Sequence, residues 1–123
     1  KLKISSHFHF TGFLKGENVD RMFAMSDVYV MPSVSEPFGI SPLEAMRSHV
    51  PVIISKQSGV AEVLDHVMKV DFWDVDAMAD AIYGLLHYKT MSEMSVTRGT
   101  EEVNNLKWES AARKVADIYQ TLV

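Results

Sequence analysis

Residues 28–46 read VYVMPSVSEPFGISPLEAM and place an apolar run, a polar loop and a helical pattern in direct succession. The run at 28–31 is nearly all apolar, which is typical of a parallel strand buried on both faces. In an open α/β sheet, ligands bind beyond the carboxyl ends of the strands. We therefore expect the loop that follows, residues 33–46, to bind a ligand.

The chemistry of this loop supports that placement. Ser41 is a plausible N-cap, Pro42 suits the first helical position, and Glu44 then completes a capping box. The N–H groups at a helix start attract anions, and Gly39 permits close approach to the backbone. Glu36 is placed to accept hydrogen bonds from sugar hydroxyls. Each residue also has a plainer interpretation: Glu44 as a cap only, Gly39 as a turn residue, Glu36 as a solvated acid.

Outward from this stretch, strand-like and helical patterns alternate, which predicts a parallel sheet covered by helices. The other expected strands are 7–10, 52–54 and, more weakly, 68–70. The remaining patterns are helical. Their expected starts are Asn18 as an N-cap, Asp74 as an N-cap, a capping box at 90–93, and Trp108 at the opening of the last helix.

Composition limits the possible classes of protein. The 123 residues fit one domain, residues 1–123, and 47% apolar with 23% charged residues is ordinary globular composition. A net charge of −4 argues against nucleic-acid binding, and the absence of cysteine excludes disulfides and thiolate metal sites. No apolar run is long enough for a membrane span. The first residues lack an initiator Met and a signal peptide's apolar core, so we expect an N-terminally truncated piece of a larger protein.

The loop resembles a known family once its residues are taken together. Glu36 and Glu44, in the form Glu-Pro-Phe-Gly-x4-Glu-Ala-Met, resemble the Glu-x7-Glu signature of retaining glycosyltransferases of the GT-B fold, in the group 1 (family 4) branch. Five ordered elements extend the resemblance over nearly the whole chain. They are residues 10–14, 26–33, 51–54, 58–62 and the pair Trp108-Glu109.

The resemblance implies an α/β fold with a Rossmann-like parallel sheet, in the donor-binding half of such an enzyme. The donor would be a UDP-, GDP- or ADP-sugar, bound without a metal or other cofactor. Glu36 would be the catalytic residue and would also bind the donor sugar, while Glu44 would hold the ribose hydroxyls. The other implied donor-binding residues are Phe38, Gly39, Ile40 and Ser41 around the sugar and phosphates, and Thr11, Gly12, Phe13 and Leu14 at the base pocket.

Three departures from the family pattern stand out. His49 occupies the position where the family usually has a left-handed Gly, and Ser58 replaces the first residue of a Gly-Gly pair. We expect the first replacement to strain the backbone and the second to shift a nearby loop. The Arg and Lys that neutralise the donor diphosphate in the family precede residue 1, and Lys15 and Lys56 are the nearest substitutes.

Alternatives remain open at this point. One is a non-catalytic nucleotide-binding α/β module, and another is a different GT-B enzyme such as a sugar-nucleotide epimerase. In the family interpretation, an absent N-terminal domain would bind a sugar or lipid-linked glycan acceptor, so this piece alone is expected to be inactive. Two central strands would also be missing, and the exposed edges predict self-association. The intact protein is expected in the cytoplasm or at the inner face of a membrane.

Overall fold

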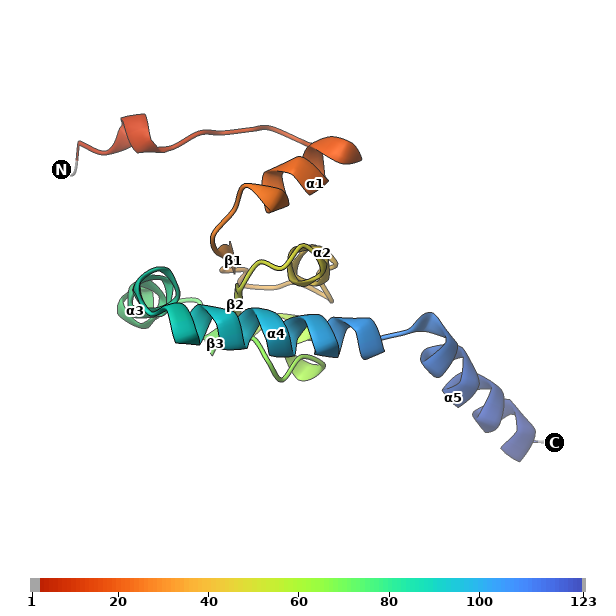
Figure 1. The fold of residues 1–123 in the computed structure, drawn as a ribbon. Coiled ribbons are helices and arrows are strands. Elements are labelled where there is room, and N and C mark those ends of the chain that lie inside the picture. The colour runs from red at the N-terminus through yellow and green to blue at the C-terminus, as the bar shows by residue number, and fades with distance from the viewer. Residues whose placement is uncertain (1–2, 123) are drawn as a thin grey trace.

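The computed structural model describes residues 3–122 (Figure 1). Helices and strands alternate in its first part, and helices follow one another in the last. The elements are the 3-10 helix η1 (Ser5–His7), α1 (Glu17–Ala24), β1 (Tyr29–Met31), α2 (Ser41–Arg47), β2 (Val52–Ser55), the 3-10 helix η2 (Gly59–Glu62), β3 (Met68–Val70), α3 (Val75–His87), α4 (Lys89–Asn105) and α5 (Trp108–Thr121).

The three strands form a parallel sheet in the order β1-β2-β3. Tyr29 lies opposite Val52, and Ile53 lies opposite Met68. All four residues of β2 are buried, as an apolar run between two neighbouring strands predicts. The expected α/β fold with a parallel sheet and three of its expected strands are therefore confirmed.

Each face of the sheet has its own hydrophobic core. One core contains Phe23 of α1, Ala45 and Met46 of α2, and Val103 of α4. The other lies under α3 and includes Ala81 and Leu85. Helix α4 packs against both α2 and α3, so it joins the two layers (Figure 1). This packing fixes the sheet between its helices and leaves the carboxyl ends of the strands free to carry loops.

The strand expected at residues 7–10 is wrong. Ser5–His7 is a 3-10 helix, and residues 8–10 have no regular structure. Phe10 is 93% exposed, so this apolar segment has no neighbouring strand or core to pack against within residues 3–122. A short β-rich run forms a strand only where a partner supplies hydrogen bonds and packing.

Three of the expected helix caps are also wrong. Helix α1 begins at Glu17 after Gly16, so Asn18 lies inside it. Helix α2 begins at Ser41 with Ile40 at the N-cap position, and no side chain caps it. Helix α4 begins at Lys89 without a side-chain cap, so the predicted box at 90–93 does not form. Asp74 is confirmed as the N-cap of α3, where its carboxylate accepts from the Ala77 N–H at 3.0 Å.

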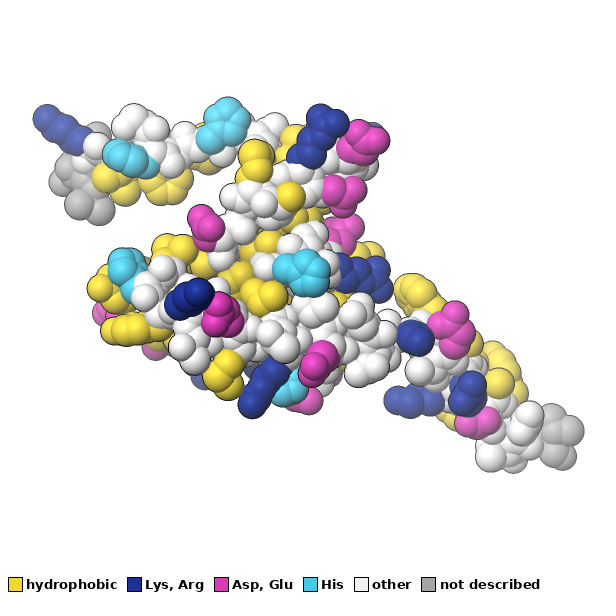
Figure 2. All heavy atoms as spheres, in the orientation of Figure 1, with side chains coloured by type: hydrophobic (Ala, Val, Ile, Leu, Met, Phe, Trp, Pro, Cys, Tyr) yellow, Lys and Arg dark blue, Asp and Glu magenta, His cyan; other side chains and the backbone are white. Residues whose placement is uncertain are grey.

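Two parts of the chain extend from the packed centre (Figure 1). Helix α5 has no buried residue, and the segment before α1 is exposed along most of its length. Figure 2 shows hydrophobic side chains along both parts. They include Phe8, Phe10, Phe13, Trp108, Ile118, Tyr119 and Leu122. Within residues 3–122, no helix is both long and apolar enough to span a membrane.

Candidate functional site

The loop after β1 makes a tight turn at Gly39, whose φ is 88°. A Cβ atom at this position would lie 3.1 Å from Cγ of Glu36 and 3.2 Å from Cε of Met31. Backbone conformation and space both favour glycine here. The turn therefore brings the half-buried Glu36 against Gly39, just before the start of α2.

The start of α2 is tied to the sheet by a side-chain hydrogen bond. The Tyr29 hydroxyl on β1 lies 2.6 Å from Oγ of Ser41. This contact uses the Ser41 hydroxyl, which the local sequence pattern predicts to cap the helix. Burial raises the pKa of Tyr29 above its ordinary value; the hydrogen bond with Ser41 opposes this shift, and the negative charges of Glu36 and Glu44 add to it.

Backbone contacts hold the loop against the chain that follows β2. The Gly59 N–H donates to the Glu36 carbonyl at 2.8 Å, and the Val60 N–H donates to the Phe38 carbonyl at 3.0 Å. Glu36 and Ser58 form a parallel bridge, which continues the β1–β2 pairing beyond the ends of both strands. These bonds fix the backbone on which the candidate ligand residues stand.

Positions 58 and 59 differ in the side chains that they can accommodate. A Cβ on Gly59 would overlap the Pro37 carbonyl group, which is backbone and unable to swing aside. Ser58 has an ordinary φ of −80° and is buried, and its hydroxyl donates to the Ser55 carbonyl at 2.7 Å. Serine is therefore accommodated at position 58 without strain, whereas glycine is required at 59.

Ser55 is a residue near the site that the sequence reasoning did not single out, and Gly59 entered it only as the second Gly of the 58–62 element. The Ser55 hydroxyl donates to the Ser33 carbonyl at 2.5 Å, so β2 itself supports the loop after β1. A serine ending an otherwise apolar strand was the available signal for this role. The contact joins residues 22 apart, and a local pattern does not reveal such pairs.

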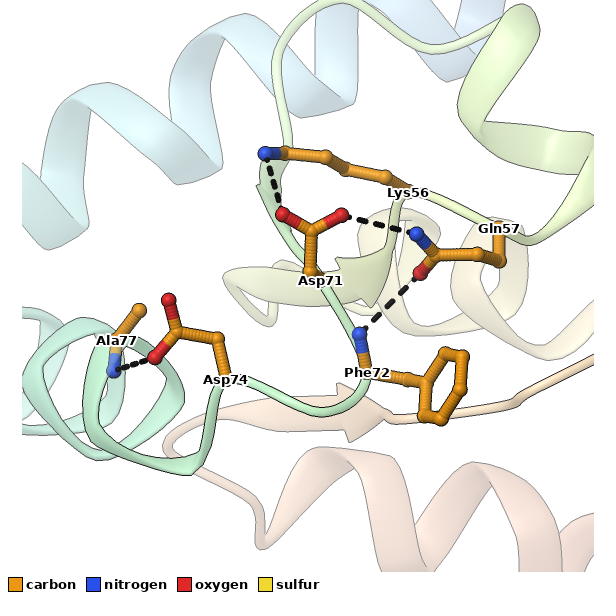
Figure 3. A network of polar contacts seen from close by, with 6 residues as sticks. All are labelled: Lys56, Gln57, Asp71, Phe72, Asp74 and Ala77. Atoms are coloured by element: carbon orange, nitrogen blue, oxygen red, sulfur yellow. Dashed lines mark hydrogen bonds and ion pairs between the residues drawn. The ribbon is translucent and has the colours of Figure 1, made fainter.

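A polar network joins the loops that follow β2 and β3 (Figure 3). The Gln57 side chain donates to the Asp71 carboxylate at 2.9 Å and accepts from the Phe72 N–H at 3.2 Å. Lys56 Nζ lies 3.0 Å from the other Asp71 oxygen. The hydrogen bond from Gln57, followed by the contact with Lys56, lowers the pKa of the Asp71 carboxyl below its ordinary value.

This network bears on the two lysines considered as diphosphate ligands. Lys56 is already paired with Asp71, which offsets part of its charge. Lys15 lies over the Phe13 ring, with Nζ 5.4 Å from the ring centroid, in the segment before α1. Neither lysine is presented as a free cation at the Glu36–Glu44 loop.

The structure brings together one of the two predicted groups of ligand residues. Glu36, Phe38, Gly39, Ile40, Ser41 and Glu44 share one continuous loop and helix start at the carboxyl end of β1. Phe38 and Ile40 are 41% and 64% exposed, so the loop is open to a ligand. No hydrogen bond between described residues joins Thr11, Gly12, Phe13 or Leu14 to this loop, and these four residues remain a prediction.

Other surface features lie elsewhere. A shallow hollow of about 320 Å³ is lined by residues of α4 and the chain before β3, including His66, Arg98 and Glu102. Among residues 3–122, no three His, Asp or Glu side chains gather in a way that would hold a metal ion. The ligand chemistry that the loop offers is therefore carboxylate oxygens and exposed backbone.

A parallel sheet flanked by helices, with a loop at the carboxyl end of a strand, places this chain in the class of Rossmann-like α/β folds. The family model "Glycosyl transferases group 1" matches residues 1–102. This match covers most of the chain, so the chain belongs to the group 1 glycosyltransferases. The resemblance that rests on Glu36 and Glu44 is confirmed at the level of the family.

Individual proteins agree with this assignment. The chain is 30% identical over 116 residues to an uncharacterized glycosyltransferase of Methanocaldococcus jannaschii, covering 90% of this chain and 30% of that protein. It is 33% identical over 112 residues to a sulfoquinovosyl transferase of Arabidopsis thaliana, covering 86% and 22%. The solved structure of sucrose-phosphate synthase from Thermosynechococcus elongatus aligns with a TM-score of 0.79 at 29% identity, covering 97% and 31%.

The chain thus spans less than a third of the length of these relatives. The superposition with sucrose-phosphate synthase supports a Rossmann-like domain of a GT-B enzyme as the fold of this region.

Proposed function

We propose that this chain is the donor-binding part of a retaining glycosyltransferase that transfers a sugar from a nucleotide-sugar to an acceptor. The observation that carries the proposal is the pair Glu36 and Glu44 on one loop and helix start, at the carboxyl end of β1, in a chain of this family. Carboxylates accept hydrogen bonds from hydroxyl groups, which both the donor sugar and the ribose provide in number.

Different residues bind different parts of the donor. Glu36, half-buried beside Gly39, accepts from hydroxyls of the transferred sugar and is the catalytic residue of the proposal. The exposed Glu44 accepts from the ribose hydroxyls. The backbone of the intervening residues meets the sugar and the diphosphate, and Thr11, Gly12, Phe13 and Leu14 line the base pocket.

The reaction breaks the bond between the anomeric carbon and the diphosphate oxygen, and the nucleoside diphosphate leaves with that electron pair. An acceptor hydroxyl oxygen forms the new bond to the anomeric carbon on the face from which the diphosphate departs, so the configuration is retained, and the hydroxyl proton passes to the departing phosphate oxygen. Stabilising negative charge on the leaving group is the main catalytic demand, and N–H groups or cations of the protein meet it. In this proposal no metal is required.

The acceptor side lies outside this chain. We assign acceptor binding to a further part of the protein, with a sugar or lipid-linked glycan as the acceptor class. The proposal places the protein in the cytoplasm, at the inner face of a membrane when the acceptor is a lipid.

The test is a binding titration of UDP-, GDP- and ADP-sugars with the native protein that carries this chain. Glu36→Ala and Glu44→Ala are each expected to weaken binding of the preferred donor about tenfold or more, since each removes charged hydrogen bonds. Glu93→Ala, a surface residue of α4, is the matched control and should change nothing. Unchanged binding in both variants would refute the assignment.

The titration also separates the proposal from a nucleotide-binding module without catalysis. Such a module would bind nucleoside diphosphates as tightly as the corresponding nucleotide-sugars. A glycosyltransferase is expected to prefer one sugar, and to lose that preference in Glu36→Ala while retaining affinity for the free nucleotide.

A further inference from the structure

Apart from the Tyr29–Ser41 contact at its end, the loop after β1 (residues 33–41, the donor loop) is held by groups of the chain in and after β2. Residues 36–38 are held by N–H groups of Gly59 and Val60, and Ser33 by the Ser55 hydroxyl. The position of the loop after β1 therefore depends on the position of the chain that follows β2. What holds that chain decides how the proposed donor site is arranged.

Gln57 lies in the chain that follows β2. It lies one residue before Ser58, the bridge partner of Glu36. Its amide nitrogen donates to Asp71 and its amide oxygen accepts from the Phe72 N–H, so it bonds both a side chain and the backbone after β3 (Figure 3). A two-point contact of this kind fixes direction as well as distance.

We infer that Gln57, held by Asp71, is a positioning residue for the Glu36–Gly39 turn: it anchors the segment that presents Gly59 and Val60 to the donor loop. This inference rests on the proposed function for its consequence, since the positioned loop is the proposed donor site. The order of contacts runs from β3 through Asp71 and Gln57 to Ser58–Val60, and from there to Glu36 and Phe38. Gln57 itself does not touch the donor.

The Lys56–Asp71 ion pair plays a lesser part. The Lys56 side chain is 53% exposed, and ion pairs at exposed sites contribute little. Lys56 also carries no hydrogen bond from its side chain to the backbone after β3 among those the structure shows. Replacing Lys56 therefore tests the charge of the network without removing the bridge.

The first measurement is amide hydrogen exchange in the native protein. In Gln57→Ala and Asp71→Ala, exchange at the Gly59 and Val60 amides is expected to accelerate about tenfold, as the loss of one ordinary hydrogen bond allows. In Lys56→Met, exchange at these two amides should stay near the native rate. The same is expected in Asp71→Asn, because the Asn side chain still accepts a hydrogen bond from Gln57. Unchanged exchange in Gln57→Ala, equal acceleration in Lys56→Met, or equal acceleration throughout β2 would overturn the inference.

The second measurement is donor kinetics. Gln57→Ala is expected to raise the KM for the donor more than it lowers kcat, with rescue in Asp71→Asn relative to Asp71→Ala. Equal kinetics in Asp71→Asn and Asp71→Ala would count against the inference. Failure of the proposed function has a different signature: no nucleotide-sugar binds, or Glu36→Ala binds normally, while the exchange experiment still decides the role of Gln57.

Discussion

At Gly59, backbone packs directly against backbone, so an added methyl group has nowhere to go. Gly59→Ala is expected to lower the free energy of unfolding by about 1–3 kcal/mol, because the Pro37 carbonyl must move. Gly84→Ala is the matched control: its Cβ would meet only Sδ and Cε of Met91, and alanine favours the interior of α3. Denaturant unfolding of both variants measures the difference, and equal stability would contradict the packing argument.

His49 has a left-handed conformation with a φ of 60°, as expected from the left-handed Gly that the family usually has at this position. Its Nδ1 lies 3.2 Å from Oγ1 of Thr100, an exposed contact that offsets little of the strain. His49→Gly is expected to raise the free energy of unfolding by about 1 kcal/mol relative to His49→Ala, which keeps the strain and loses the contact. A glycine variant no more stable than the alanine variant would show that the backbone is relaxed.

At the scale of single elements, ionisation of Asp71 adds a small stabilisation to the loops after β2 and β3, beyond the Gln57 contact that an uncharged acceptor keeps. A carboxyl whose pKa is lower in the folded state stabilises the fold above its unfolded pKa, and this stabilisation is lost as pH falls through the folded pKa. The gap in unfolding free energy between the native protein and Asp71→Asn should be widest near neutral pH and shrink below about pH 4.

Denaturant unfolding across a pH series measures this gap. Asp80→Asn, at an exposed position on α3, is the control for removing one negative charge. A gap that stays constant from neutral to acidic pH would mean that the Asp71 contacts do not depend on its charge.

The elements also show how far sequence reasoning reaches. The strands β1 and β2 were predictable because continuous apolar runs need burial on both faces, whereas β3, with Lys69 in its middle, was only weakly indicated. The Asp74 cap was predictable because it is a local contact. The cap of α2 was not predictable, since the Ser41 hydroxyl is engaged by Tyr29 from β1. The family resemblance at 58–62 contains a glycine at 59, but the reason for it, a pairing between two loops, is visible only in the structure.

At the scale of the whole molecule, apolar surface is left uncovered over residues 3–122. Helix α5 forms as its pattern predicts, yet Ile118 and Tyr119 are 59% and 66% exposed. Aromatic residues before α1 are exposed as well, Phe10 among them. Apolar surface of this extent favours association with other surfaces. We therefore expect the 123-residue chain, produced by itself, to self-associate in solution.

Sedimentation at several protein concentrations tests this expectation through the average mass. Ile118→Glu is expected to lower the association constant about tenfold or more, because burying an unpaired charge costs several times the gain from the side chain it replaces. Lys114→Glu, on the same helix and with the same introduced residue, controls for added negative charge. A chain that remains monomeric at every concentration, or a larger effect from Lys114→Glu, would show that α5 does not mediate the contact.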